Sequence, residues 1–120
     1  MTVLLAEDEV VVRNLLHRIL VLQGYEVLVG ANGREALELS QAFDGEIHLI
    51  LSDVHMPEMN GLDLAVAVRV TRPRVEILLM SGRFSGELSK LPSLSEVIRK
   101  PFLPKALIER VQTLLTRREF

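Results

Sequence analysis

Short apolar runs alternate along the chain with longer stretches in which apolar residues recur every three or four positions. Short runs indicate buried strands, whereas the three- and four-residue spacing indicates amphipathic helices. Regular alternation of the two is typical of βα units that assemble into a parallel sheet. Five strands are predicted, at residues 3–6, 25–29, 47–51, 75–80 and 96–99.

Five helices are expected to alternate with these strands. Four are well marked, at residues 12–20, 33–43, 62–70 and 104–117. The first is predicted to end near Gly24, and the last to begin at Pro104, a residue type favoured in the first helical turn. The fourth, within residues 82–95, is expected to be short or irregular, because Gly86, Pro92 and the serines of that stretch disfavour a long helix.

Crossover connections between parallel strands are right-handed, so helices are expected on both faces of the sheet. The predicted fold class is therefore α/β, with a doubly wound five-stranded parallel sheet. A chain of 120 residues has the length of one domain, and residues 1–120 are expected to form it. Hydrophobic residues make up 48% of the chain, which is enough for a substantial core.

The charge of the chain and its lack of cysteine limit which partners and which cellular compartment are expected. Fourteen Lys and Arg against sixteen Asp and Glu give a net charge of -2, so neither nucleic acid nor a membrane is expected as a partner of this chain. The absence of cysteine excludes disulfides and thiolate metal sites. No apolar stretch approaches the roughly 18 residues that span a bilayer, and no signal peptide precedes the first apolar run. The expected location is the cytoplasm.

Polar residues follow four of the predicted strands at the point where each apolar run ends. Glu7 and Asp8 follow the first run, Asp53 the third, Ser81 the fourth and Lys100 the fifth. Parallel strands bring their carboxyl ends to one edge of the sheet, which is where open α/β sheets place their sites. Carboxylates that meet there repel one another unless a cation joins them.

Mg²⁺ (or Mn²⁺) is the expected cation, because such ions prefer oxygen ligands. Asp8 and Asp53 are candidate direct ligands, Glu7 a ligand through water, and a backbone carbonyl just after Asp53 a further one. A carboxylate beside Mg²⁺ can also attack phosphorus as a nucleophile. Lys100 and Ser81 supply the charge and the hydroxyl that such a reaction needs, so an aspartyl phosphate on Asp53 is chemically plausible from these residues alone.

Four short motifs resemble those of the CheY-like receiver domains of response regulators in two-component signal transduction. The similar segments are Glu7-Asp8-Glu9, Ser52-Asp53-Val54-His55-Met56-Pro57 with Gly61, Met80-Ser81-Gly82, and Lys100-Pro101-Phe102. Any one of them alone is a weak signal. All four occur in order and at matching spacing, and the resemblance extends from Val3 to the last helix.

This resemblance implies a function and a set of partners. The family fold is flavodoxin-like, with strand order 2-1-3-4-5. Asp53 is expected to accept a phosphoryl group from a phosphohistidine of a sensor histidine kinase or a phosphotransfer protein. The phosphorylated domain would then change conformation for a downstream protein that the sequence does not name. On this basis the chain is a phosphoacceptor switch rather than an enzyme.

The resemblance also implies a role for each site residue. Glu7, Asp8, Asp53 and the backbone carbonyl of His55 are expected to hold Mg²⁺. Ser81 and Lys100 are expected to bind phosphoryl oxygens, and the Lys100–Pro101 bond is expected to be cis.

Residues around the site are expected to modulate the switch. Many family members have Tyr or Phe three positions before the lysine, whereas this chain has Val97, whose branched side chain cannot make the large aromatic swing. His55 and Arg83 are expected to flank the phosphoryl group and to shield it from water. Gly82, between Ser81 and Arg83, is assigned to the same modulating set.

Three other functions are weighed against this one. A phosphohydrolase of the haloacid-dehalogenase type also uses Mg²⁺ and a nucleophilic Asp, but it expects a second Asp where His55 stands. A docking module that is never phosphorylated has generally lost the acceptor or the lysine, and this chain has both Asp53 and Lys100. A flavin-binding flavodoxin needs a phosphate-binding loop after the first strand, where this chain has an acidic pair.

Overall fold

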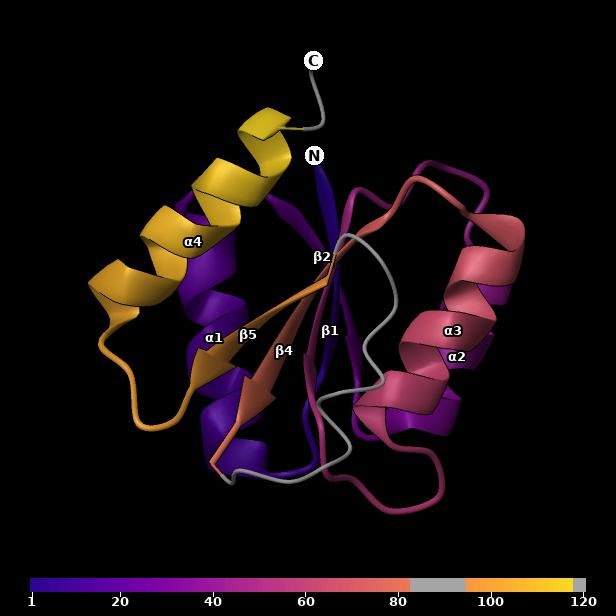
Figure 1. The fold of residues 1–120 in the computed structure, drawn as a ribbon, viewed down its shortest axis with the longest axis horizontal. Coiled ribbons are helices and arrows are strands. Elements are labelled where there is room, and N and C mark those ends of the chain that lie inside the picture. The colour runs from indigo at the N-terminus through magenta and orange to yellow at the C-terminus, as the bar shows by residue number, and fades with distance from the viewer. Residues whose placement is uncertain (83–94, 118–120) are drawn as a thin grey trace.

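The structure is a computed structural model of the chain, and it describes residues 1–82 and 95–117. A single five-stranded parallel sheet forms its centre, with strand order β2-β1-β3-β4-β5 (Figure 1). The strands are β1 (Thr2–Ala6), β2 (Glu26–Gly30), β3 (Leu49–Asp53), β4 (Glu76–Ser81) and β5 (Ser95–Arg99). The predicted strand number, parallel direction and order are confirmed.

Four helices are present in the described residues: α1 (Val10–Leu22), α2 (Gly33–Ala42), α3 (Gly61–Thr71) and α4 (Pro104–Arg117). They match the four well-marked predictions to within two residues at every end. The remaining predicted helix, within residues 82–95, falls almost entirely outside the described part of the chain. The observed architecture is therefore a flavodoxin-like sheet with four described helices rather than the five predicted.

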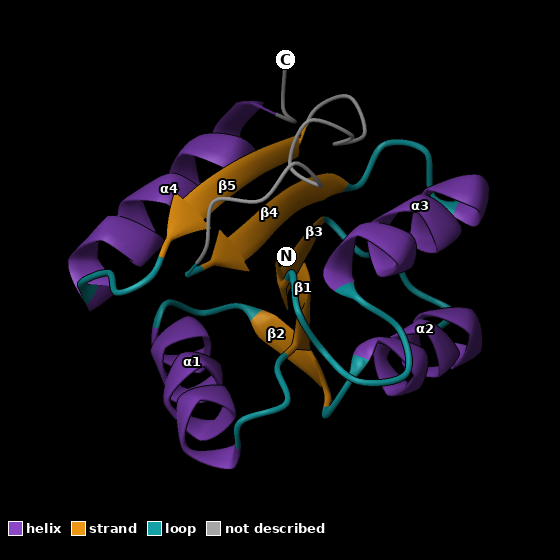
Figure 2. Ribbon diagram, turned by 60° about the horizontal axis from the view of Figure 1, so that its bottom comes forward, coloured by secondary structure: helices purple, strands orange, loops and turns teal. Residues whose placement is uncertain are grey.

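The helices form two layers on the sheet. Figure 2 shows α1 and α4 on one face and α2 and α3 on the other. Successive side chains of a strand point to opposite faces, so β1 contributes residues to the hydrophobic core on each side of the sheet. Val3 and Leu5 pack under α1 and α4, while Leu4 and Ala6 pack under α2 and α3. All four are fully buried, as expected for a central strand.

Asparagine residues fix the starts of α2 and α3. The Oδ1 atom of Asn32 accepts from the Glu35 amide at 2.8 Å, and that of Asn60 accepts from the Asp63 amide at 2.8 Å. Side-chain caps of this kind satisfy amides that have no partner within the helix. Because Asn60 caps α3, the loop after β3 has a defined end only seven residues beyond Asp53.

Arg72 fixes the opposite end of this helical layer, directly after α3. Its guanidinium donates to three backbone carbonyls at and just after the end of α2, at 2.8–3.0 Å. Carbonyls in the last turn of a helix have no partner within the helix, and a guanidinium with several donors can satisfy more than one of them. Arg72 therefore ties α2 to α3.

The start of β3 differs from the prediction by two residues. Ile47 is buried although it lies outside the strand, and apolarity alone placed it inside. The strand instead continues through Ser52 to Asp53, so the expected acceptor is the last residue of β3 and does not lie two residues beyond its end, as the predicted strand over 47–51 implied. No helix in residues 1–82 or 95–117 has the length and apolar character needed to cross a membrane.

Candidate functional site

The predicted site residues gather at the carboxyl edge of the sheet, where the arrowheads of the strands lie in Figure 1. Glu7 directly follows β1, and Lys100 directly follows β5, while Asp53 and Ser81 are the last residues of β3 and β4. Strands β1, β3, β4 and β5 are consecutive in the sheet. Four segments far apart in sequence are therefore brought to one place by the strand order alone.

Three carboxylates meet at this edge. One oxygen each from Glu7, Asp8 and Asp53 lies within 4.8 Å of the other two. The environments differ: Glu7 is fully buried, Asp8 is exposed and the side chain of Asp53 is 13% exposed. Of the residues that the structure describes, this trio is the group of side chains that could hold a metal ion.

Lys100 places an ammonium against two of these carboxylates. Its Nζ atom donates to Glu7 Oε1 at 3.0 Å and to Asp53 Oδ2 at 2.9 Å. The peptide bond to Pro101 is cis, as expected from the family resemblance. The Lys100 amide also donates to the Ser81 carbonyl at 2.8 Å, which continues the pairing of β4 with β5 up to the site.

The charges at the site perturb one another. Burial raises the pKa of Glu7, and the negative charge of Asp53 raises it further, while the contact with Lys100 opposes both. For Lys100, burial lowers the pKa, but the hydrogen bonds and charges of Asp53 and Glu7 together outweigh burial and leave it raised. Lys100 therefore stays an ammonium at neutral pH and contacts two of the three carboxyl groups.

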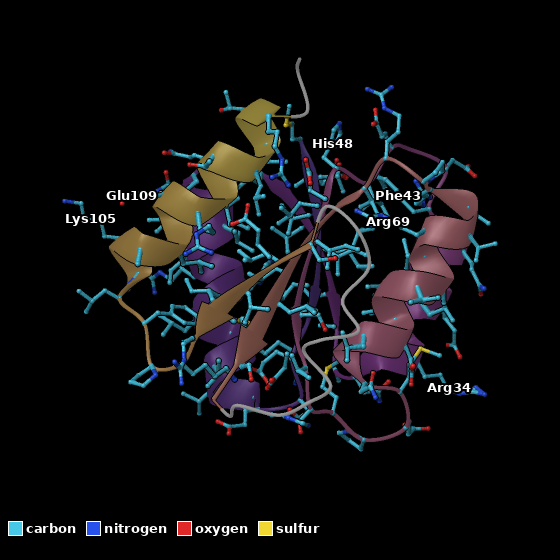
Figure 3. The ribbon with its side chains drawn as sticks, in the orientation of Figure 1. Arg34, Phe43, His48, Arg69, Lys105 and Glu109 are labelled. Atoms are coloured by element: carbon cyan, nitrogen blue, oxygen red, sulfur yellow. The ribbon has the colours of Figure 1, made fainter. Side chains whose placement is uncertain are left out.

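This donor set fits a hard divalent cation. Carboxylate oxygens are the ligands that Mg²⁺ and Mn²⁺ take, and a buried carboxyl with a raised pKa gains most from a nearby cation. Two of the three imidazoles lie elsewhere: His17 is on the exposed side of α1, and Figure 3 shows His48 at the other end of the sheet. The Nδ1 atom of His48 accepts from the Thr2 amide at 2.9 Å, which is a structural role.

The remaining predicted residues lie around this centre. Ser81 is 3% exposed and stands one residue beyond Met80, which pairs with Asp53 in the sheet register. Gly82 is exposed, and a Cβ added there would meet nothing nearer than Lys100 Cβ at 3.9 Å. The side chain of His55 is exposed, two residues after Asp53. Its carbonyl as a metal ligand remains a prediction.

Val97 and Arg83 are the other two residues that were predicted to modulate the switch. Val97 is partly buried on β5 and packs against the core under α2 and α3. A small branched side chain therefore occupies the position where an aromatic residue is common in the family. Arg83 lies outside the described residues.

The backbone of Asp53 is held by contacts that the sequence did not indicate. The buried Ser52 hydroxyl donates to the Asp53 carbonyl at 2.9 Å, and the Val54 amide donates to the Met80 carbonyl at 3.0 Å. Gly61 lies so close that a Cβ atom there would collide with the Asp53 carbonyl oxygen. The sequence Asn60-Gly61 indicated a turn but gave no sign of this contact.

A second contact that the sequence did not indicate involves Arg13 on α1. Its Nη1 atom donates to the backbone carbonyl of Glu7 at 3.0 Å. Nothing in the sequence distinguishes Arg13 from the other polar residues of α1, because the contact depends on where the helix lies relative to the end of β1.

Comparisons with known proteins agree with this geometry. The family model described as "Response regulator receiver domain" matches residues 3–112. The sensor kinase CckA of Brucella abortus is 37% identical over 98% of this chain, which corresponds to 13% of that protein. The aerobic respiration control protein ArcA of Escherichia coli K12 is 34% identical over 96% of this chain and 48% of its own length. The chain thus spans half or less of the length of the curated relatives that it matches.

Solved structures show the same likeness. The receiver domain of the hybrid histidine kinase CckA superposes with a TM-score of 0.85 at 34% identity, covering 96% of this chain and 99% of that one. A response regulator receiver protein from Sinorhizobium medicae gives a TM-score of 0.88 at 27% identity, covering 98% and 96%. The chain belongs to the response regulator receiver domain family, the phosphoacceptor module of two-component signalling.

Proposed function

We propose that Asp53 is the phosphoacceptor and that it takes its phosphoryl group from a phosphohistidine of a sensor histidine kinase or a phosphotransfer protein. The observation that carries this proposal is the placement of Asp53, whose carboxylate ends a buried strand with an ammonium at 2.9 Å and two further carboxyl groups beside it. A carboxylate in such a position is partly exposed and can reach a donor from outside.

The chemistry follows from the residues around Asp53. A carboxylate oxygen of Asp53 attacks phosphorus, the new P–O bond forms, and the P–N bond to the donor imidazole breaks. The Lys100 ammonium and the Ser81 hydroxyl bind the phosphoryl oxygens, whose charge must be balanced during transfer. Lys100 already contacts Asp53 before transfer, so it needs little rearrangement to follow the negative charge onto the phosphoryl group.

Glu7, Asp8 and Asp53, with the backbone carbonyl of His55, are proposed to hold Mg²⁺ or Mn²⁺. When bound, the cation neutralises carboxylate and phosphoryl charge. Among residues 1–82 and 95–117, support comes from the meeting of three carboxyl groups, only two of which contact Lys100, and from the raised pKa of the buried Glu7. Without added positive charge, a phosphoryl group would enter a site that already repels it.

Phosphorylation is proposed to bias the domain between two conformations that a downstream protein distinguishes. Val97 has no aromatic ring to move, so the readout is proposed to act through the backbone of β4 and β5, which are joined at the site by the bond from the Lys100 amide to the Ser81 carbonyl. His55, Gly82 and Arg83 are proposed to set how long the acyl phosphate survives. Residues 1–120 are proposed to act as a single receiver domain.

The test is intact mass after incubation with Mg²⁺ and a small phosphodonor, acetyl phosphate or phosphoramidate. The native chain is expected to gain one phosphoryl group, in Mg²⁺ and not in EDTA, and Asp53→Asn is expected to gain none. Asp44→Asn, which changes an exposed Asp outside the site, is the matched control and is expected to behave as the native chain does.

The same experiment separates the alternatives. A native chain that binds Mg²⁺ but acquires no phosphoryl group would favour a docking module. Steady release of phosphate from unrelated phosphomonoesters would favour a phosphohydrolase. Either result would overturn the assignment of Asp53 as the acceptor of a signalling phosphoryl group.

A further inference from the structure

The segment that links β1 to α1 carries Glu7 and Asp8, and its backbone is fixed at few points. The Glu7 amide donates to the Gly30 carbonyl at 3.2 Å, and the Glu9 amide donates to the carboxylate of Glu7 at 3.3 Å. Glu9 is the N-cap residue of α1, yet its side chain makes no capping hydrogen bond. The start of the helix therefore does not anchor this segment in the way that Asn60 anchors the loop after Asp53.

Arg13 supplies the missing anchor. Its amide donates to the Glu9 carbonyl at 2.8 Å as part of α1, and its Nη1 atom reaches back to the Glu7 carbonyl at 3.0 Å. The same residue thus holds the chain on both sides of Asp8. Its side chain is only partly exposed, so the contact is shielded from competing water.

The opposite side of the site is held independently. Asp53 is the last residue of a strand, and Ser52 and Gly61 confine its backbone. A shift of the segment that carries Glu7 and Asp8 would therefore move two carboxylates relative to a third that stays in place. Mg²⁺ requires nearly octahedral geometry at short distances, so its affinity is sensitive to such a shift.

We propose that Arg13 is a positioning residue of the metal site, which holds Glu7 and Asp8 at the spacing from Asp53 that the cation needs. It acts through the backbone carbonyl of Glu7 and touches no reacting atom. This inference rests on the proposed function, because it assigns Arg13 a role in the Mg²⁺ binding proposed for that site. Partners that orient metal ligands typically change metal affinity by about 10- to 100-fold when they are removed.

The experiment compares Arg13→Met with Arg18→Met in the full chain. Arg18 is an exposed residue of the same helix, so its variant removes the same charge from α1 without altering a contact at the site. Titration calorimetry with Mg²⁺ alone is expected to show about tenfold weaker binding for Arg13→Met. Arg18→Met is expected to bind as the native chain does. If Arg13→Met does not fold, Arg13→Gln replaces it with the same expected loss.

Phosphorylation by acetyl phosphate gives a second readout. For Arg13→Met the Mg²⁺ concentration at half-maximal rate is expected to rise about tenfold, while the rate at saturating Mg²⁺ returns to within about twofold of the native rate. A merely structural role would lower the unfolding temperature and leave the Mg²⁺ dissociation constant unchanged, which would overturn the inference. A native chain that binds no Mg²⁺ would overturn the proposed metal site itself. This result can be told apart from a failure of the Arg13 inference, because only the absence of a metal site would appear in the native chain.

Discussion

Replacing Lys100 by methionine is expected to destabilise the metal-free protein by about 3 kcal/mol. The change removes the ammonium that lies 3.0 Å from Glu7 Oε1 and 2.9 Å from Asp53 Oδ2. Removal of one partner from a buried ion pair costs about 3–5 kcal/mol, because the other charge stays buried. Glu7 is fully buried, but the exposed fractions of 26% for Lys100 and 13% for Asp53 admit some water and place the loss at the lower end of this range.

The assay is thermal unfolding at pH 7 in EDTA. A domain of 120 residues has an unfolding entropy of about 0.25 kcal/mol/K, so 3 kcal/mol corresponds to a midpoint lowered by about 12 °C. Lys105→Met is the matched control, because Figure 3 shows Lys105 on α4 directed away from the sheet. That variant is expected to stay within about 0.5 kcal/mol of the native chain.

A substitution at Glu7 tests the cause of this loss. Burial raises the pKa of Glu7 above its usual 4.5, so this group stabilises the fold below pH 4.5 and loses that contribution as the pH rises through its folded-state pKa. Because burial disfavours the ionised form of Glu7, Glu7→Gln is expected to be more stable than the native chain in EDTA. With glutamine at position 7, Lys100→Met is expected to cost only about 1 kcal/mol. An equal cost in both backgrounds would refute the buried-pair reasoning.

Three further outcomes are expected. With a dissociation constant of about 1 mM, about 10 mM Mg²⁺ adds about 1.4 kcal/mol to the free energy of unfolding and should raise the unfolding midpoint by about 6 °C. An unfolding midpoint equal to that in EDTA would contradict the proposed metal site. Gly61→Ala should lower the free energy of unfolding by about 2 kcal/mol, because its Cβ would collide with the Asp53 carbonyl. Gly82→Ala should not lower it, because the nearest neighbour of its Cβ lies at 3.9 Å. Equal losses for the two variants in urea unfolding would contradict the steric argument. Arg72→Met should lower the free energy of unfolding by about 2 kcal/mol, because three backbone carbonyls lose their donor, and should leave the Mg²⁺ dissociation constant unchanged. Arg34→Met, which changes an exposed residue, should cause no measurable loss of stability. Equal unfolding midpoints for the two variants would show that the Arg72 hydrogen bonds contribute little.

The sheet could be predicted from the sequence because its strands are buried on both faces and are almost purely apolar. Leu4 and Leu5 face opposite cores, and both positions are apolar for that reason. The boundaries were less readable. Ile47 is buried without belonging to β3, and Ser52 belongs to β3 although it is polar, since its hydroxyl binds the next carbonyl. Tertiary contacts of single residues decided these ends, and composition does not encode them.

The location of the site was readable for a different reason. Parallel strands bring their carboxyl ends to one edge, and the family resemblance implied the strand order, so Asp53 and Lys100 were expected at the same edge of the sheet. The ion pair between Lys100 and Glu7 and the bond from Arg13 to the Glu7 carbonyl were not readable. Both depend on side-chain directions that are set only when α1 and β5 have packed.

The phosphoryl group is expected to reside on the carboxylate of Asp53. The most direct measurement is borohydride reduction of the phosphorylated native chain, which converts an aspartyl phosphate to homoserine, followed by peptide mass mapping. Homoserine is expected at position 53 and in place of no other aspartate. Homoserine at another position, or a phosphoryl group that resists borohydride and hydroxylamine, would contradict it.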